Sequence, residues 1–151
     1  MIGARALMLH GVGLQRETRD WDVTITASFT KELRDCITGM LRSKGFKVQW
    51  KKWGLLVEDD IHVDINYAPL ILDEEWEARA LHITGNVYLP SIEDLVILKL
   101  MSGERKDISN VKKAVTQKIE ELDLAYMLRR AREAGIEKEL ARLLRRIGVK
   151  I

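Results

Sequence analysis

Residues 16–26 read RETRDWDVTIT, and from Asp20 onward polar residues alternate with the apolar Trp21, Val23 and Ile25. This period of two predicts a strand with one apolar and one polar face. Asp20 and Asp22 share the polar face, about 6–7 Å apart along the strand. Carboxylates this close repel each other unless a cation lies between them, and Mg²⁺ prefers such oxygen ligands. The pattern leaves two interpretations open: part of a metal site, or a solvated strand face that carries two acids.

A second stretch, residues 61–65, reads IHVDI and alternates in the same way. Asp64 and His62 lie on its polar face, and the other face is expected to be core. If this strand lies beside the first, Asp64 faces the same site as Asp20 and Asp22. His62 is then a polar-face neighbour of that site, and we expect it to be exposed.

Composition restricts the class of protein. The chain has 151 residues, 46% hydrophobic and 32% charged, with a formal net charge of +2. This predicts one domain over residues 1–151, with a sheet-containing core in 1–90 and a helical part in 91–151. The charged fraction is typical of thermophilic proteins. No apolar run approaches the ~18 residues of a membrane span, so we expect no membrane partner.

Cys36 is the single cysteine, so an intrachain disulfide is excluded. Together with the absence of a signal-peptide pattern, this favours the cytoplasm. The apolar residues near it repeat at helical spacing after Thr30, which can cap a helix, and Gly45 can end that helix. We therefore expect Cys36 and these apolar residues to pack in the core.

The other predicted elements follow from periodicity and capping signals. A short helix over 4–9 begins at Gly3, and Ser91 and Gly103 bound a later helix, after which Asp107 or Ser109 opens the next. The remaining predicted elements are strands at 46–50 and 55–57, a short helix or turn at 74–76, a hairpin of 79–83 and 87–89, and helices at 122–134 and 136–147.

Basic residues accumulate after residue 126. Three acids, Glu133, Glu137 and Glu139, oppose them. Two interpretations stay open: a solvated helix surface with ion pairs such as Arg129–Glu133 and Glu139–Arg142, or a surface that binds RNA or a protein partner. The eight basic residues are Arg129, Arg130, Arg132, Lys138, Arg142, Arg145, Arg146 and Lys150.

Several short motifs occur in a fixed order between Gly3 and about Val111. After the Gly3 helix come R-x-T-x-D-x-D at 16–22, the acid Asp64, P-S-I-E-D-L at 90–95, K-L at 99–100 and R-K-D at 105–107. This order resembles the nucleotidyltransferase superfamily, and most of all its minimal and AbiEii-like branch.

The resemblance implies an α+β fold, a small mixed sheet with a helical C-terminal part. It implies transfer of a nucleoside monophosphate from a nucleoside triphosphate (NTP) to an acceptor hydroxyl on RNA or protein, with Mg²⁺ or Mn²⁺ as cofactor. Asp20, Asp22 and Asp64 would be the catalytic and metal-binding residues. The residues implied to bind the nucleotide are Gly3, Ala4, Arg16, Thr18, Lys99, Arg105, Lys106 and Asp107.

Two alternatives remain from other classes of protein. The first is a non-catalytic module that keeps the fold and acts in a toxin–antitoxin or RNA-binding complex. Ala4, where many members of that branch carry a serine, favours it. The second is an RNA-binding protein that uses its basic C-terminal helices and needs no metal. For the last four nucleotide-binding candidates, a salt-bridge cluster at the helix ends is an equal alternative.

Overall fold

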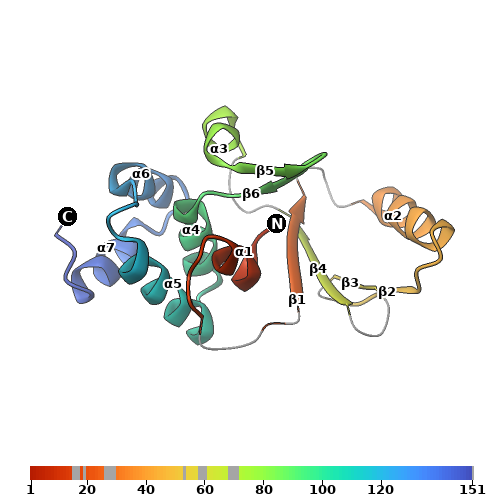
Figure 1. Ribbon diagram of the computed structural model, residues 1–151, viewed down its shortest axis with the longest axis horizontal. Coiled ribbons are helices and arrows are strands. Elements are labelled where there is room, and N and C mark those ends of the chain that lie inside the picture. The colour runs from red at the N-terminus through yellow and green to blue at the C-terminus, as the bar shows by residue number, and fades with distance from the viewer. Residues whose placement is uncertain are drawn as a thin grey trace.

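The computed structural model describes residues 1–14, 18, 20–25, 30–52, 54–57, 61–67 and 72–150, apart from the side chains of residues 66 and 67. The fold is α+β, as predicted, with a mixed sheet and a C-terminal set of helices. The molecule is elongated, with α6 (Leu124–Glu133) and α7 (Glu137–Arg146) at one end, the sheet in the other half and α2 (Lys31–Ser43) beyond it (Figure 1).

The larger sheet has the strand order β1-β4-β3-β2, with β1 at Asp20–Ile25, β2 at Val48–Trp50, β3 at Leu55–Val57 and β4 at Ile61–Tyr67. Strands β1 and β4 run parallel, and β3 is antiparallel to both of its neighbours. A separate hairpin of β5 (Leu81–Thr84) and β6 (Val87–Leu89) follows α3 (Glu74–Arg79). Each of these strands overlaps a segment predicted from alternation.

The main core lies among the helices and not on the sheet. It joins α1 (Gly3–Leu9) to four C-terminal helices and contains residues such as Leu7, Leu95 and Leu144, all fully buried. Figure 1 shows α1 between β1 and α4, so this short helix links the two halves of the molecule. The four helices are α4 (Ile92–Ser102), α5 (Arg105–Lys118), α6 (Leu124–Glu133) and α7 (Glu137–Arg146).

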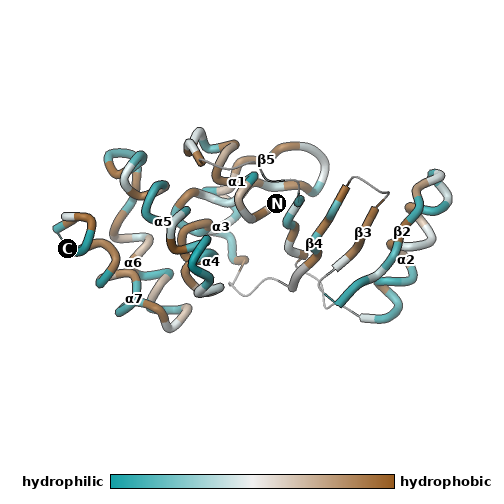
Figure 2. Tube along the Cα trace, turned by 90° about the horizontal axis from the view of Figure 1, so that it is seen from below, coloured by the Kyte–Doolittle hydropathy of each residue, from teal (hydrophilic) through white to brown (hydrophobic). Residues whose placement is uncertain are grey.

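The expected burial of the strands and of α2 is wrong in part. Trp21 is 39% exposed and Ile61 is 42% exposed, although both lie on the apolar strand face. Helix α2 has no buried residue, and Cys36 is exposed. The reason is its position: α2 projects past β2, against which it packs through a hydrogen bond from Trp50 Nε1 to Thr38. Figure 2 shows this end of the molecule mostly in hydrophilic colours around α2.

Capping signals place most helix ends correctly. The side chains of Thr30 and Ser91 accept hydrogen bonds from Leu33 N–H and Asp94 N–H, and Gly103 ends α4 at a φ of 67°. The predicted start of α5 is wrong. Its cap is Glu104, whose carbonyl accepts from Asp107 N–H and Ile108 N–H, so Asp107 lies inside the first turn. This backbone pattern needs no side-chain cap and therefore leaves little signal in sequence.

None of the helices among the residues described combines the length and apolar composition needed to cross a membrane.

Candidate functional site

A pocket of about 300 Å³ lies where α1, β1 and β4 meet the junction of α4 and α5. It gathers acids from two strands, the beginning of α1 and the Lys99 region, which are far apart in sequence. Its described lining residues are Ile2, Gly3, Ala4, Thr18, Asp20, Asp22, Asp64, Leu98, Lys99, Ser102, Glu104, Lys106 and Asp107.

The register of β1 and β4 places the acids. The two strands pair in parallel with Asp22 opposite Asp64 and Asp20 opposite His62. Neighbouring strands are about 4.8 Å apart, and residues in register point to the same face. All three aspartates therefore lie on one sheet face and line one pocket. His62 is beside them, with its Nδ1 3.7 Å from Asp20 Oδ1.

Gly3 allows α1 to begin directly against β1. Ile2 forms a bridge with Asp22, its N–H donating to Asp22 O at 2.7 Å. At Gly3 φ is +83°, and a Cβ there would lie 1.8 Å from Asp22 Oδ2. Only glycine fits both the left-handed backbone and this close approach. The close contact with Asp22 therefore explains why a glycine stands at position 3.

Burial and mutual repulsion raise the pKa of two of the acids. Burial raises the pKa of Asp22 most, and Asp64 adds to the shift while Lys99 opposes it. Burial and the charge of Asp20 raise the pKa of Asp64, against His62 and Lys106. These carboxylates are held where their negative charge is poorly compensated, which is the electrostatic condition that favours a bound cation.

Lys99 supplies the buried positive charge of the pocket. It is 8% exposed, and its Nζ lies 2.5 Å from Asp107 Oδ1, while Ser102 Oγ donates to the other oxygen of Asp107. Burial alone would raise the pKa of Asp107, but the hydrogen bonds from Lys99 and Ser102 and the charge of Lys99 outweigh it and lower that pKa. Lys99 is therefore held by Asp107, and its charge also acts on Asp22 of β1.

The sequence of the chain matches a known protein family. Residues 1–142 match the family described as nucleotidyltransferase of unknown function (DUF6036). The chain belongs to this nucleotidyltransferase family. No curated protein matches it.

The nucleotidyltransferase pocket holds most of the residues that the sequence singled out. Gly3, Ala4, Thr18, Lys99, Lys106 and Asp107 line it together with the three aspartates. Arg105 is exposed on α5 and is not among the described lining residues, so the structure does not bring it to the pocket. Arg16 lies outside the described residues.

The donor chemistry of the pocket fits a divalent cation, because carboxylate oxygens are the ligands Mg²⁺ and Mn²⁺ take. Within the described residues, no group of three His, Cys, Asp or Glu side chains is already placed to hold a metal ion. The three aspartates nevertheless share one pocket.

Sequence reasoning missed Ser102 and Glu104. Ser102 orients Asp107, and Glu104 pairs with Lys106 at 2.9 Å between Oε2 and Nζ. Ser102 follows Lys99 by three residues on the same helix, so helical spacing could have placed it beside Lys99. Its contact with Asp107 depends on how α4 turns into α5, which no local pattern records.

Proposed function

We propose that this nucleotidyltransferase transfers a nucleoside monophosphate from an NTP to an acceptor hydroxyl on RNA or protein. The observation that carries the proposal is the single pocket in which carboxylates from β1 and β4 face the buried Lys99. Carboxylates with raised pKa values favour a bound divalent metal, and the fixed positive charge beside them suits a triphosphate.

In this proposal Asp20, Asp22 and Asp64 hold Mg²⁺ or Mn²⁺, which supplies charge neutralisation on the phosphates and a more acidic acceptor oxygen. The acceptor oxygen attacks the α-phosphorus, the bond from that phosphorus to the bridging oxygen breaks, and pyrophosphate leaves with the bond's electrons. The acceptor proton passes to a carboxylate of the pocket, and we assign this role to Asp64, which lies opposite Asp22 on the neighbouring strand.

The cationic residues of the pocket are assigned to the triphosphate and not to the metal. Lys99 is held by Asp107 and carries a fixed charge that meets developing negative charge without reorganisation. Lys106 lies at the exposed rim, where its side chain is 59% exposed. We assign contact with the triphosphate to these two lysines, with Thr18 and the Gly3–Ala4 segment lining the same space.

The test uses each of the four α-³²P-labelled NTPs with Mg²⁺ or Mn²⁺, and total RNA and total protein as acceptors. We expect label to pass to one acceptor class with the wild type and not with Asp22→Asn. Absence of transfer from every NTP to every acceptor, together with a melting curve that ignores both metal and NTP, would contradict the proposal.

A second candidate is a non-catalytic module of the same fold in a toxin–antitoxin or RNA-binding complex, as the AbiEii-like resemblance suggests. The observation that favours it is Ala4, which lines the pocket at the position where many members of that branch carry a serine. It predicts a chain that binds its partner equally well with and without metal, and whose binding is unchanged in Asp22→Asn.

A further inference from the structure

The basic residues after position 126 divide into two groups in the structure. One group is engaged in ion pairs. Arg130, 1% exposed, contacts Asp94, Asp73 and Glu133. Arg129 pairs with Glu75 and with Glu133, and the second pair is the one that helical spacing predicts. Arg132 pairs with Glu137. These arginines connect α3, α4, α6 and α7, and each of them already has a carboxylate partner.

The second group lies on the outer side of α7. Lys138, Arg142 and Arg145 are spaced by four and three residues and therefore share one side of the helix. The opposite side carries Leu140, Leu143 and Leu144, which are buried. We call Lys138, Arg142, Arg145 and Arg146 the cationic face; all four are exposed.

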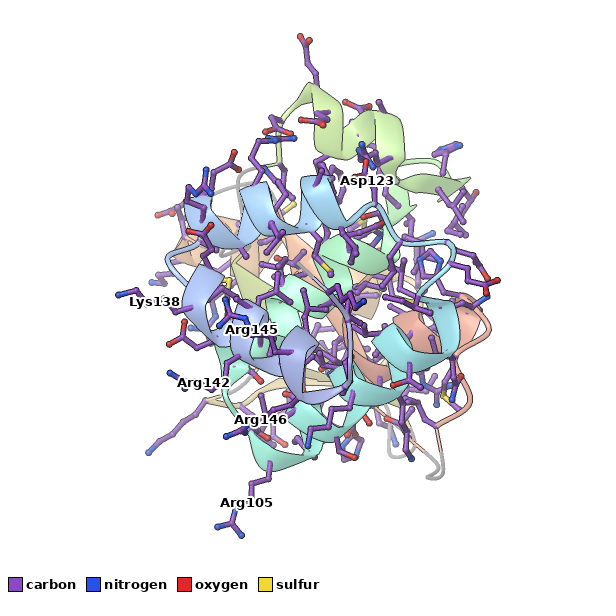
Figure 3. The ribbon with its side chains drawn as sticks, turned by 90° about the vertical axis from the view of Figure 1, so that its left-hand side faces the viewer. Arg105, Asp123, Lys138, Arg142, Arg145 and Arg146 are labelled. Atoms are coloured by element: carbon purple, nitrogen blue, oxygen red, sulfur yellow. The ribbon has the colours of Figure 1, made fainter. Side chains whose placement is uncertain are left out.

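No acid neutralises the cationic face among the residues that the structure describes. The predicted pair of Glu139 with Arg142 is not formed, and the described ion pairs include none of the four cations. Figure 3 shows the four side chains along one side of the molecule, with the acid Asp123 well away from them. Asp123 is itself paired with Arg79 at 2.8 Å. Among the described residues, none of the four cations is therefore held in an ion pair, although Glu139 lies three residues before Arg142 on the same helix.

Arg105, next in sequence to two residues of the pocket, lies on the same side of the view as the cationic face (Figure 3). In Figure 3 Arg105 extends outward beyond Arg146, at the lower edge of the same view. Arg105 follows Glu104 and precedes Lys106, and both of these residues line the pocket. A nucleic acid that spans from the cationic face to Arg105 would therefore reach the residues next to the rim of the pocket.

The chemistry of the face indicates the kind of partner. The apolar side of α7 is buried, so the helix has no apolar side to insert into a membrane. The exposed large hydrophobic residues of the described chain all precede residue 90, so α7 offers no apolar centre for a protein interface. A row rich in arginine with no apolar centre fits a phosphate backbone, which arginine binds through paired hydrogen bonds.

We propose that the cationic face binds the phosphate backbone of a nucleic acid and presents that nucleic acid to the pocket as acceptor. The acceptor role rests on the proposed function, whereas the binding itself does not. Because the contacts are to phosphates, RNA and DNA strands of the same sequence should both bind.

The test measures binding of a fluorescein-labelled 20-nucleotide single-stranded RNA by anisotropy, without NTP, across a KCl series. The variant Arg142→Gln/Arg145→Gln/Arg146→Gln should bind at least ~10-fold more weakly at low salt. The slope of log K against log salt should become shallower by about 2, since each phosphate contact with a single strand contributes about 0.7. The matched control is Lys31→Gln/Lys44→Gln/Lys51→Gln, which removes the same charge from exposed lysines at the α2 end.

We expect the control to bind as the wild type does. Equal binding by the wild type and the α7 variant, equal loss in the control, or no binding by the wild type at 50 mM KCl would each overturn the proposal. A parallel assay with labelled NTP then tests the acceptor role: the α7 variant should show a raised KM for the nucleic acid and an unchanged kcat. Binding without transfer by any protein, wild type included, would contradict the proposed function and leave the binding surface intact.

Discussion

Replacement of Lys99 by methionine removes the buried cation of the pocket while keeping the length of the side chain. In the wild type the side chains of Lys99 and Asp107 are 9% and 10% exposed, and Nζ lies 2.5 Å from Oδ1. The change leaves Asp107 buried with only Ser102 as a direct hydrogen-bond partner from this cluster. We expect the free energy of unfolding to fall, because a buried carboxylate has lost its counter-charge.

The magnitude follows from the burial of both partners. Removing one member of a buried ion pair costs about 3–5 kcal/mol. For a chain of 151 residues each kcal/mol shifts Tm by about 2–4 °C, so the lower bound corresponds to about 6–12 °C. Asp107→Asn should cost less, since it leaves an amide that still hydrogen-bonds. The double variant should be more stable than the sum of the single losses predicts, by about 1–3 kcal/mol of coupling.

The pH dependence has a definite sign. Asp107 has a lowered pKa in the folded protein, so its contribution to stability is present above the ordinary aspartate range and is lost as pH falls through the folded pKa. The wild type should therefore lose its advantage over Lys99→Met below about pH 4. The same change removes the charge that opposes the raised pKa of Asp22, so that pKa should rise further.

The assay is urea unfolding followed by circular dichroism from pH 3 to pH 8, with melting curves in parallel. Lys106→Met is the matched control, because Lys106 lines the same pocket with its side chain 59% exposed. It should change the free energy of unfolding by less than ~0.5 kcal/mol. A Lys99→Met variant as stable as this control, or strict additivity with Asp107→Asn, would refute the reasoning.

Three further changes test the site and the fold. Gly3→Ala should lower both nucleotide transfer and the stabilisation by metal, because its Cβ would lie 1.8 Å from Asp22 Oδ2. Transfer assays and melting curves with Mg²⁺ measure the two effects, and a variant unaffected in both would contradict the close contact of Gly3 with Asp22. Asp22→Asn should lower transfer by about 10²-fold or more. The pKa of Asp22 is raised in the folded protein, so its ionised form destabilises the metal-free protein above the ordinary aspartate range. The variant should therefore melt at or above the Tm of the wild type at pH 7, and this advantage should disappear as the pH falls. A lower Tm of the variant at pH 7 would argue against this. Cys36→Ser should leave stability within ~0.5 kcal/mol, and Cys36 should react with a thiol reagent in the native protein, because it is exposed; protection from the reagent would contradict its placement.

The sequence alone determined the local structure and the identity of the chemical groups. Alternation at 20–25 and 61–65 predicted both strands and the polar face on which Asp20, Asp22 and Asp64 lie. Thr30, Ser91 and Gly103 predicted helix ends, because capping needs a side-chain oxygen or a left-handed backbone at one position. Such features repeat within a few residues, so they can be read without knowing the fold.

Only the tertiary structure decided which residues meet. The parallel register sets Asp22 opposite Asp64, and the approach of α1 sets Gly3 against Asp22. The turn from α4 to α5 brings Asp107 against Lys99, and Arg105 lies outside the pocket. Asp22 and Asp64 are 42 residues apart in sequence, and no local period encodes the register that brings them together. Apolar spacing likewise predicted an apolar side of α2, but what covers a helix depends on where it is packed, and α2 lies beyond the sheet, where Cys36 meets solvent.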